Sequence, residues 1–169
     1  MPFPAAPKFG GLVIAKVPGM GEGNNVFFGE WTPRAGNPPQ NSTDLNMGDS
    51  RRTVWYVGDN PTTNMPNLVN AQYNVLGVNK HTPGQNDFYT GVLTANYGTG
   101  SGSLTGTLSR PGDNINFAGT NIRSNGTFDN GKANEHISGR FYGSGAEALA
   151  GIVDRAGVDK DVAFGGRKQ

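Results

Sequence analysis

Residues 103–109 read Ser-Leu-Thr-Gly-Thr-Leu-Ser, and this alternation of polar and apolar positions decides the fold class. Successive side chains of a β-strand point to opposite faces of the sheet. Leu104, Gly106 and Leu108 therefore share one face, while the hydroxyl side chains share the other. A strand with one buried and one wet face is typical of antiparallel sheets. The segment predicts an antiparallel strand that lines a core.

Similar segments recur on both sides of this strand, at intervals close to the roughly 8–12 residues expected of all-β sandwiches and barrels. Seven or eight of them lie between Arg51 and Gln169, at 53–57, 71–78, 87–97, 103–109, 115–122, 137–142, 147–153 and 162–165. Turn sequences such as Asp129-Asn-Gly separate them, so hairpins dominate the connectivity. The pattern predicts an all-β fold, a closed antiparallel barrel without exposed strand edges.

The first 50 residues have a different organisation. Segments 12–17 and 26–32 read as strands, and 33–50 as a loop or linker without periodicity. We therefore divide the chain into a small N-terminal β-rich subdomain, residues 1–50, which faces the ligand, and a barrel, residues 51–169.

Composition points to a binding protein rather than an enzyme. The net charge is +1, which provides no field for nucleic acid or an anionic membrane, and the chain has no cysteine. Thiolate nucleophiles and cysteine-based metal sites are therefore excluded. There is no nucleophile elbow, no helix-borne histidine pair and no apolar run near the ~18 residues of a membrane helix. We expect a soluble, non-catalytic chain.

Without cysteine, the two histidines are the best soft metal ligands. His136 shares a strand face with polar residues, so it should face solvent. His81 lies in the loop Lys80-His-Thr-Pro-Gly, and loops at barrel mouths are where ligands are held. An ordinary turn histidine is the alternative for His81. Met20, also in a turn, is a candidate haem-iron ligand, although turn methionines usually fill gaps.

Phe27, Phe28 and Trp31 place a large aromatic surface on one short strand. In one interpretation they cap the open end of the barrel as core. In the other they line an apolar pocket for a flat ligand, whose acidic groups would meet Arg34, Arg51 or Arg52. The two interpretations are compatible.

The C-terminal strands resemble a known family. The run His136-Ile-Ser-Gly-Arg-Phe-Tyr-Gly-Ser-Gly-Ala-Glu-Ala-Leu-Ala-Gly-Ile-Val follows Gly102-Ser-Leu-Thr-Gly-Thr-Leu-Ser-Arg-Pro-Gly-Asp-Asn-Ile and precedes Val162-Ala-Phe-Gly-Gly-Arg-Lys. Phe-Tyr-Gly, Ala-Glu-Ala-Leu-Ala-Gly and the terminal Phe-Gly are the specific elements. In this order and spacing they resemble the C-terminal barrel of the transferrin-binding protein B-like surface lipoproteins, over roughly residues 51–169.

The resemblance implies an eight-stranded barrel in a Gram-negative protein. Family members reach the outer surface, or are released, through Slam-type translocons of the type XI secretion system. Different members bind transferrin, complement factor H, haemoglobin or haem. The compact plan of this chain is most similar to the hemophilins, which are secreted haem-binding hemophores.

From this resemblance we expect a secreted or surface-located haem-binding protein that serves iron acquisition. His81 would bind the iron and the aromatic side chains would cover the porphyrin. Arginines, Arg34 foremost, would meet the propionates. The expected partners are haem, a host haemoprotein, the Slam-type translocon and an outer-membrane haem receptor, and we expect a monomer. The alternative is a surface module that binds haemoglobin, transferrin or a complement regulator without a cofactor.

Overall fold

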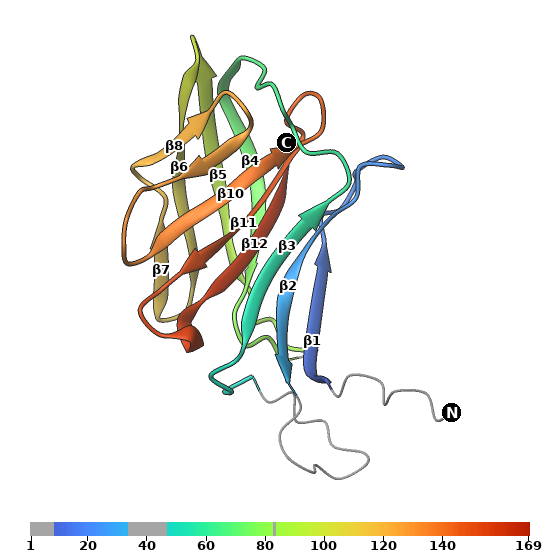
Figure 1. Cartoon of the computed structure of the whole chain (residues 1–169), viewed down its shortest axis with the longest axis vertical. Helices are drawn as coiled ribbons and strands as arrows, with labels where there is room; N and C mark the ends of the chain where they lie inside the picture. The colour runs from blue at the N-terminus through green and yellow to red at the C-terminus, as the bar shows by residue number, and fades with distance from the viewer. Residues whose placement is uncertain (1–8, 34–46, 83) are drawn as a thin grey trace, which may run out of the picture.

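The computed structural model describes residues 9–33, 47–82 and 84–169, and within these ranges twelve strands form two antiparallel sheets (Figure 1). The smaller sheet has the order β1-β2-β3, with β1 at Phe9–Lys16, β2 at Val26–Pro33 and β3 at Thr53–Gly58. One short 3-10 helix spans Val158–Lys160. None of the helical structure in the described ranges is long and apolar enough to span a membrane.

The larger sheet closes into an eight-stranded barrel, which confirms the predicted fold class. Its strands follow one another in the order β5-β4-β12-β11-β10-β9-β8-β6, and β6 pairs with β5 to complete the ring. The bounds are β4 Leu68–Val78, β5 Tyr89–Gly98, β6 Ser101–Arg110, β8 Thr120–Arg123, β9 Thr127–Asp129, β10 His136–Tyr142, β11 Ala148–Asp154 and β12 Val162–Lys168. An extra strand, β7 at Asp113–Asn116, pairs only with β6. Closure leaves the barrel strands without free edges.

The segment 115–122, predicted as one strand, is two strands joined by a tight turn. β7 ends at Asn116 and β8 begins at Thr120. In the turn between them, the Thr120 N–H donates to the Phe117 carbonyl over 3.1 Å, and Gly119 has a φ of +88°. Only glycine adopts that backbone conformation readily. The prediction of a continuous strand was therefore wrong.

Within the barrel interior, a row of rings and glycines runs across four neighbouring strands. Phe128 lies opposite Gly139, Gly139 opposite Gly151, and Gly151 opposite Phe164. The two phenylalanine rings converge over the two glycines, with centroids 6.2 Å apart. All four residues are buried. The glycines provide the volume that the rings occupy, a packing device known from designed sheets.

The small sheet packs against the outer wall of the barrel, beside β11 and β12 (Figure 1). Small residues on this wall, Ala148, Ala150 and Ala163, allow the close approach. Phe28 lies directly over Gly165, where a Cβ atom would come within 2.5 Å of its ring. The prediction that the aromatic strand caps the open end of the barrel is corrected: it covers the side wall.

The strand at 53–57 also needs a correction, because the division at residue 50 assigned it to the barrel. In the structure this strand is β3, which pairs with β2 from Trp31↔Thr53 to Val26↔Gly58. The polypeptide therefore completes the small sheet before it enters the barrel at β4.

Candidate functional site

The predicted aromatic residues of β2 point to two different sides of the small sheet. Phe28 is buried on the inner face, against the barrel. Phe27 and Trp31 occupy the alternate positions and are only partly buried, on the outer face. The structure therefore does not bring the three side chains together in one pocket.

The outer face of the small sheet is apolar. The cross-strand rows Leu12–Trp31–Thr53, Ile14–Gly29–Trp55 and Lys16–Phe27–Val57 define it, and we call these residues the outer face. Ile14 is 57% exposed and Val57 is 54% exposed. A Cβ atom at Gly29 would come within 2.7 Å of the Trp55 indole, so the glycine makes room for this ring. An exposed apolar face is a candidate interaction surface.

On the inner side, next to the contact between the small sheet and the barrel, lies an apolar groove of about 500 Å³. Its lining comes from β1 and the residues after it, from β2, and from β4, β5 and β12: Ala15, Lys16, Val17, Pro18, Phe28, Asn74, Val75, Leu76, Thr90, Gly91, Val92, Gly165 and Gly166. Leu76 and Val92 project outward from the barrel and are 41% and 43% exposed. Its volume lies within the range of about 300–1,000 Å³ typical of small-molecule sites.

His81 lies in the loop between β4 and β5, where several contacts fix its ring. Nδ1 is bonded to Oδ1 of Asp87, and the ring stacks on Phe88 with centroids 4.3 Å apart and an interplanar angle of 18°. The other Asp87 oxygen accepts the Thr82 N–H over 2.9 Å. Burial raises the pKa of Asp87, but the bonds from Thr82 and His81 outweigh it and hold this pKa below its usual value. Asp87 is therefore an anionic acceptor for the imidazole.

The His81 ring has the environment of a metal-binding histidine. Within the described part of the chain, Nε2 has no hydrogen-bond partner, while Nδ1 is held by a carboxylate. In metal-ligating histidines, the N–H group of the second ring nitrogen characteristically donates a hydrogen bond to such a carboxylate. This bond fixes the tautomer and orients the ring. His81 is not among the residues that line the apolar groove.

Glu30 connects the His81 loop to β2, the strand whose Phe28 lines the groove. It lies on the inner face of β2, two residues from Phe28, a spacing of about 7 Å along a strand. Its Oε1 accepts the His81 main-chain N–H over 2.7 Å. The phenyl ring that lines the groove and the carboxylate that holds the loop are thus neighbours on one strand face.

Arg52 is the ion-pair partner of Glu30 and is not available to a ligand. Both side chains are fully buried, and Arg52 Nε donates to Glu30 Oε2 over 2.8 Å. The role of Arg52 near acidic ligand groups was therefore predicted wrongly. Sequence reasoning also missed Glu30, although a carboxylate at an inward-facing position of an apolar strand is the pattern of a paired buried charge.

The remaining predicted residues are spread over the molecule. Arg51 is exposed and pairs with Asp49, and Arg34 lies outside the described residues. Met20 packs at the edge of the sheet–barrel contact and lines a separate pocket of about 290 Å³ with Glu147, Arg167 and other polar residues. Of the predicted residues, Phe28 therefore lines the groove, while His81 does not line it and is bonded through its main chain to Glu30 on the same strand.

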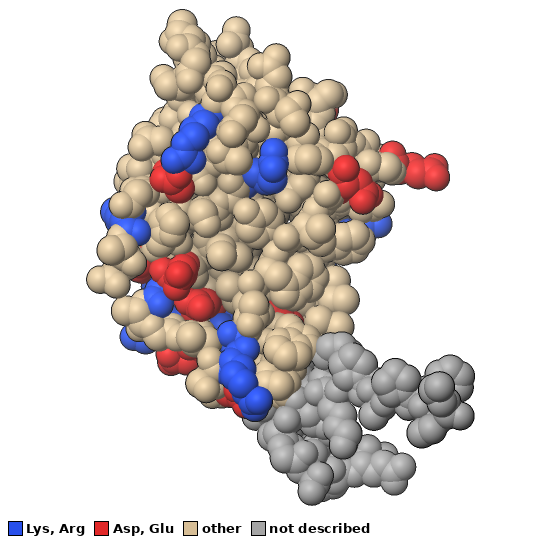
Figure 2. All heavy atoms as spheres, viewed as in Figure 1, with Lys and Arg blue, Asp and Glu red and all other residues tan. Residues whose placement is uncertain are grey.

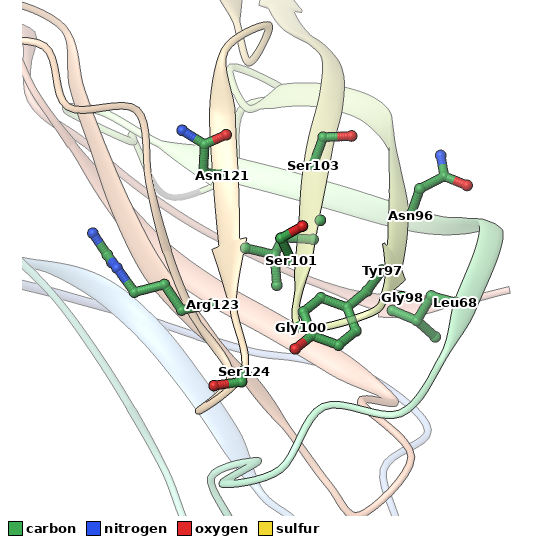
Figure 3. Close-up of a pocket in the computed structure, with 12 residues that line it drawn as sticks. Leu68, Asn96, Tyr97, Gly98, Gly100, Ser101, Ser103, Asn121, Arg123 and Ser124 are labelled. Carbon is green, nitrogen blue, oxygen red and sulfur yellow. The ribbon is translucent and has the colours of Figure 1, made fainter.

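Another concavity, of about 820 Å³, lies at the tip of the β5–β6 hairpin and the adjoining ends of β4 and β8. Figure 3 shows Asn96, Ser101, Ser103 and Asn121 projecting from these strands in different directions. None of the predicted site residues lines it. On the face drawn in Figure 2, acidic and basic groups are intermixed across a largely uncharged surface.

Fold and site together define a glycine-rich antiparallel barrel that carries a small sheet on its wall and a ligand-sized groove between the two. Residues 63–168 match the family described as the HphA C-terminal domain. The match covers more than half of the chain, so the chain belongs to this family.

Two solved structures share the fold. A crystal structure described as a surface lipoprotein has a TM-score of 0.55 and 18% sequence identity, over 100% of this chain and 86% of that chain. Transferrin binding protein B from Actinobacillus pleuropneumoniae has a TM-score of 0.57 and 16% identity, over 96% and 83% of the two chains. At these identities the likeness establishes a common, transferrin-binding protein B-like architecture.

Proposed function

We propose that this protein is an exported haem-binding protein of the hemophilin type, which a Gram-negative bacterium uses to acquire haem iron. One observation carries the proposal: Nδ1 of the His81 imidazole is bonded to Asp87, and the main chain of His81 is bonded to Glu30 on β2, the strand whose Phe28 lines an apolar groove of suitable size. Membership of the HphA C-terminal domain family supports it. On this proposal the partners are haem, a host haemoprotein, a Slam-type translocon and an outer-membrane haem receptor.

Each group has a defined part in this function. Bound haem supplies an iron that accepts a nitrogen lone pair. His81 offers Nε2, and Asp87 keeps the proton on Nδ1, which maintains the tautomer that can bind a metal. Phe28, Leu76 and Val92 provide apolar surface that excludes water from the groove.

Titration of the apo protein with hemin tests the proposal. The wild type should give a shifted, saturable Soret band. Asp87→Asn should weaken binding by about 10–100-fold, the usual cost of losing the outer partner of a metal-ligating histidine. His81→Ala should weaken it at least as much and remove the spectral features of histidine ligation.

His136→Ala is the matched control, because His136 lies on β10 with its side chain only partly buried and should leave the band unchanged. No saturable band in the wild type would sink the haem proposal. A band that His81→Ala leaves intact would contradict only the assignment of the ligand.

The outer face supports a second candidate function, a surface module that binds a host protein without a cofactor. Three large apolar side chains, Leu12, Ile14 and Val57, are about half exposed on it. Interface cores are enriched in aromatic residues and depleted in charge, and Lys16 is the charged residue of these cross-strand rows.

Biolayer interferometry with haemoglobin, transferrin and complement factor H as analytes tests this candidate. The double variant Ile14→Ser/Val57→Ser should bind more than about tenfold more weakly to whichever analyte the wild type binds. The reason is that truncation of central apolar contacts costs over ~1 kcal/mol of binding free energy. Val69→Ser, at an apolar position of β4 that is 83% exposed, is the control. Equal capture by the outer-face variant and the control would contradict a role of this face.

A further inference from the structure

Glu30 is a buried carboxylate whose donors come from two distant parts of the chain. Oε2 accepts Arg52 Nε over 2.8 Å, a further bond from Arg52 Nη2, and the Lys80 main-chain N–H over 2.8 Å. Oε1 accepts the His81 main-chain N–H over 2.7 Å. A buried charge requires such full satisfaction. Two of these four donors are the consecutive main-chain N–H groups of Lys80 and His81.

The convergence of two successive N–H groups on Glu30 depends on an unusual backbone conformation. Lys80 has a φ of +52°, in the left-handed region that non-glycine residues rarely adopt. Successive residues of opposite hand form an anion-binding concavity in which neighbouring N–H groups point to one acceptor. The carboxylate of Glu30 therefore holds the loop in a conformation that a free loop would leave.

Arg52 connects this arrangement to a third segment. Its Nη1 donates to the Val158 carbonyl over 3.0 Å and its Nη2 to the Asp161 carbonyl over 2.9 Å. Arg52 thus forms the ion pair with Glu30 and also holds the loop that precedes β12. Neither task requires the amides of Lys80 and His81, so the bonds from these two amides to Glu30 serve the His81 loop itself.

We propose that Glu30 is a positioning residue for His81: by bonding the main-chain N–H groups of residues 80 and 81 to β2, it sets the position from which the imidazole offers Nε2 to a ligand. Asp87 and Phe88 orient the ring, while Glu30 fixes the backbone from which the ring extends. The small sheet thus determines the ligand position of a barrel loop. This inference rests on the proposed role of His81 in haem binding.

The test compares the wild type with Glu30→Gln/Arg52→Met, in the apo form and with hemin. The double variant removes both buried charges, so it should fold, since apolar replacement of a buried ion pair is often neutral for stability. Amide hydrogen exchange at residues 80 and 81 should accelerate by about tenfold or more while core amides stay protected. The nuclear Overhauser contact between the His81 and Phe88 rings should weaken, and the Soret band of the hemin complex should shift.

Two controls separate positioning from general stability. Glu22→Gln makes the same chemical change in the exposed β1–β2 turn and should leave every readout as in the wild type. Arg52→Lys keeps a cation beside Glu30, so the amides of residues 80 and 81 should stay protected even if the melting temperature falls.

Unchanged exchange and an unchanged Soret band in a folded double variant would overturn the role of Glu30 while leaving haem binding intact. If the wild type itself gives no Soret band, the haem proposal fails, and the ligand-positioning role of Glu30 fails with it. The exchange data on the apo form identify this case, because amide exchange at residues 80 and 81 still accelerates in the double variant. Should the double variant not fold, the wild-type data decide: exchange at residues 80 and 81 as fast as at Asn86 in the same loop would overturn the clamp.

Discussion

Replacing Arg52 with alanine is expected to destabilise the protein by about 3–5 kcal/mol, the cost of leaving one partner of a buried ion pair without the other. Glu30 is 0% exposed and would keep its charge with only two main-chain donors. The carbonyls of Val158 and Asp161 would lose their guanidinium donor at the same time. Urea denaturation followed by tryptophan fluorescence should show a lower midpoint.

The neighbouring arginine provides the control. Arg51 pairs with Asp49 at the surface, where its side chain is 66% exposed, so Arg51→Ala should change the free energy of unfolding by less than about 1 kcal/mol. If Arg52→Ala is no more destabilising than Arg51→Ala, the Glu30–Arg52 pair does not join the small sheet to the barrel in the way described.

Gly151→Val is expected to destabilise the barrel by about 3 kcal/mol or more, at the upper end of the range for overpacking a core. A Cβ atom at this position would lie 2.6 Å from Phe164 Cζ and 2.3 Å from the Ser138 carbonyl oxygen. Phe164 has no exposed surface and its ring faces Phe128 and Phe117, so it has no free volume to move into. Thermal unfolding measured by circular dichroism should show a lower melting temperature than in the wild type.

Gly48→Val is the matched substitution, because a Cβ atom there would meet nothing within 4 Å and the residue is exposed. Its melting temperature should stay close to that of the wild type. A Gly151→Val protein as stable as Gly48→Val would mean that the rings of Phe128 and Phe164 do not pack over the two glycines as described.

Strand alternation made most of the barrel predictable. The two-residue period at 103–109 and the recurring turn sequences indicated antiparallel strands, and the structure has them. The break within 115–122 also left a trace: Ile115 and Phe117 are buried at odd positions, whereas Thr120 and Ile122 are buried at even positions. This change of phase requires a turn, and reading the segment as one strand overlooked it.

The same period separates the side chains of β2, because Phe28 and Glu30 share one face and Phe27 and Trp31 the other. Which face meets the barrel is not encoded in the strand. It follows from the packing of Phe28 on Gly165, a residue about 140 positions later in the chain, whose missing side chain admits the ring. The membership of β3 in the small sheet is likewise a matter of long-range pairing, because the segment 53–57 carries a strand pattern that fits either sheet.

By itself, the sequence determined that this protein is an antiparallel barrel with polar residues in its turns, and that His81 is a candidate metal ligand in a loop. Tertiary structure alone decided that the small sheet lies on the side wall, that a groove opens between the two sheets, and that Glu30 clamps a loop about 50 residues away. The physical reason is that strand formation and turns depend on local side-chain alternation and backbone conformation. Docking of a sheet and satisfaction of a buried charge depend on groups that only the folded chain brings together.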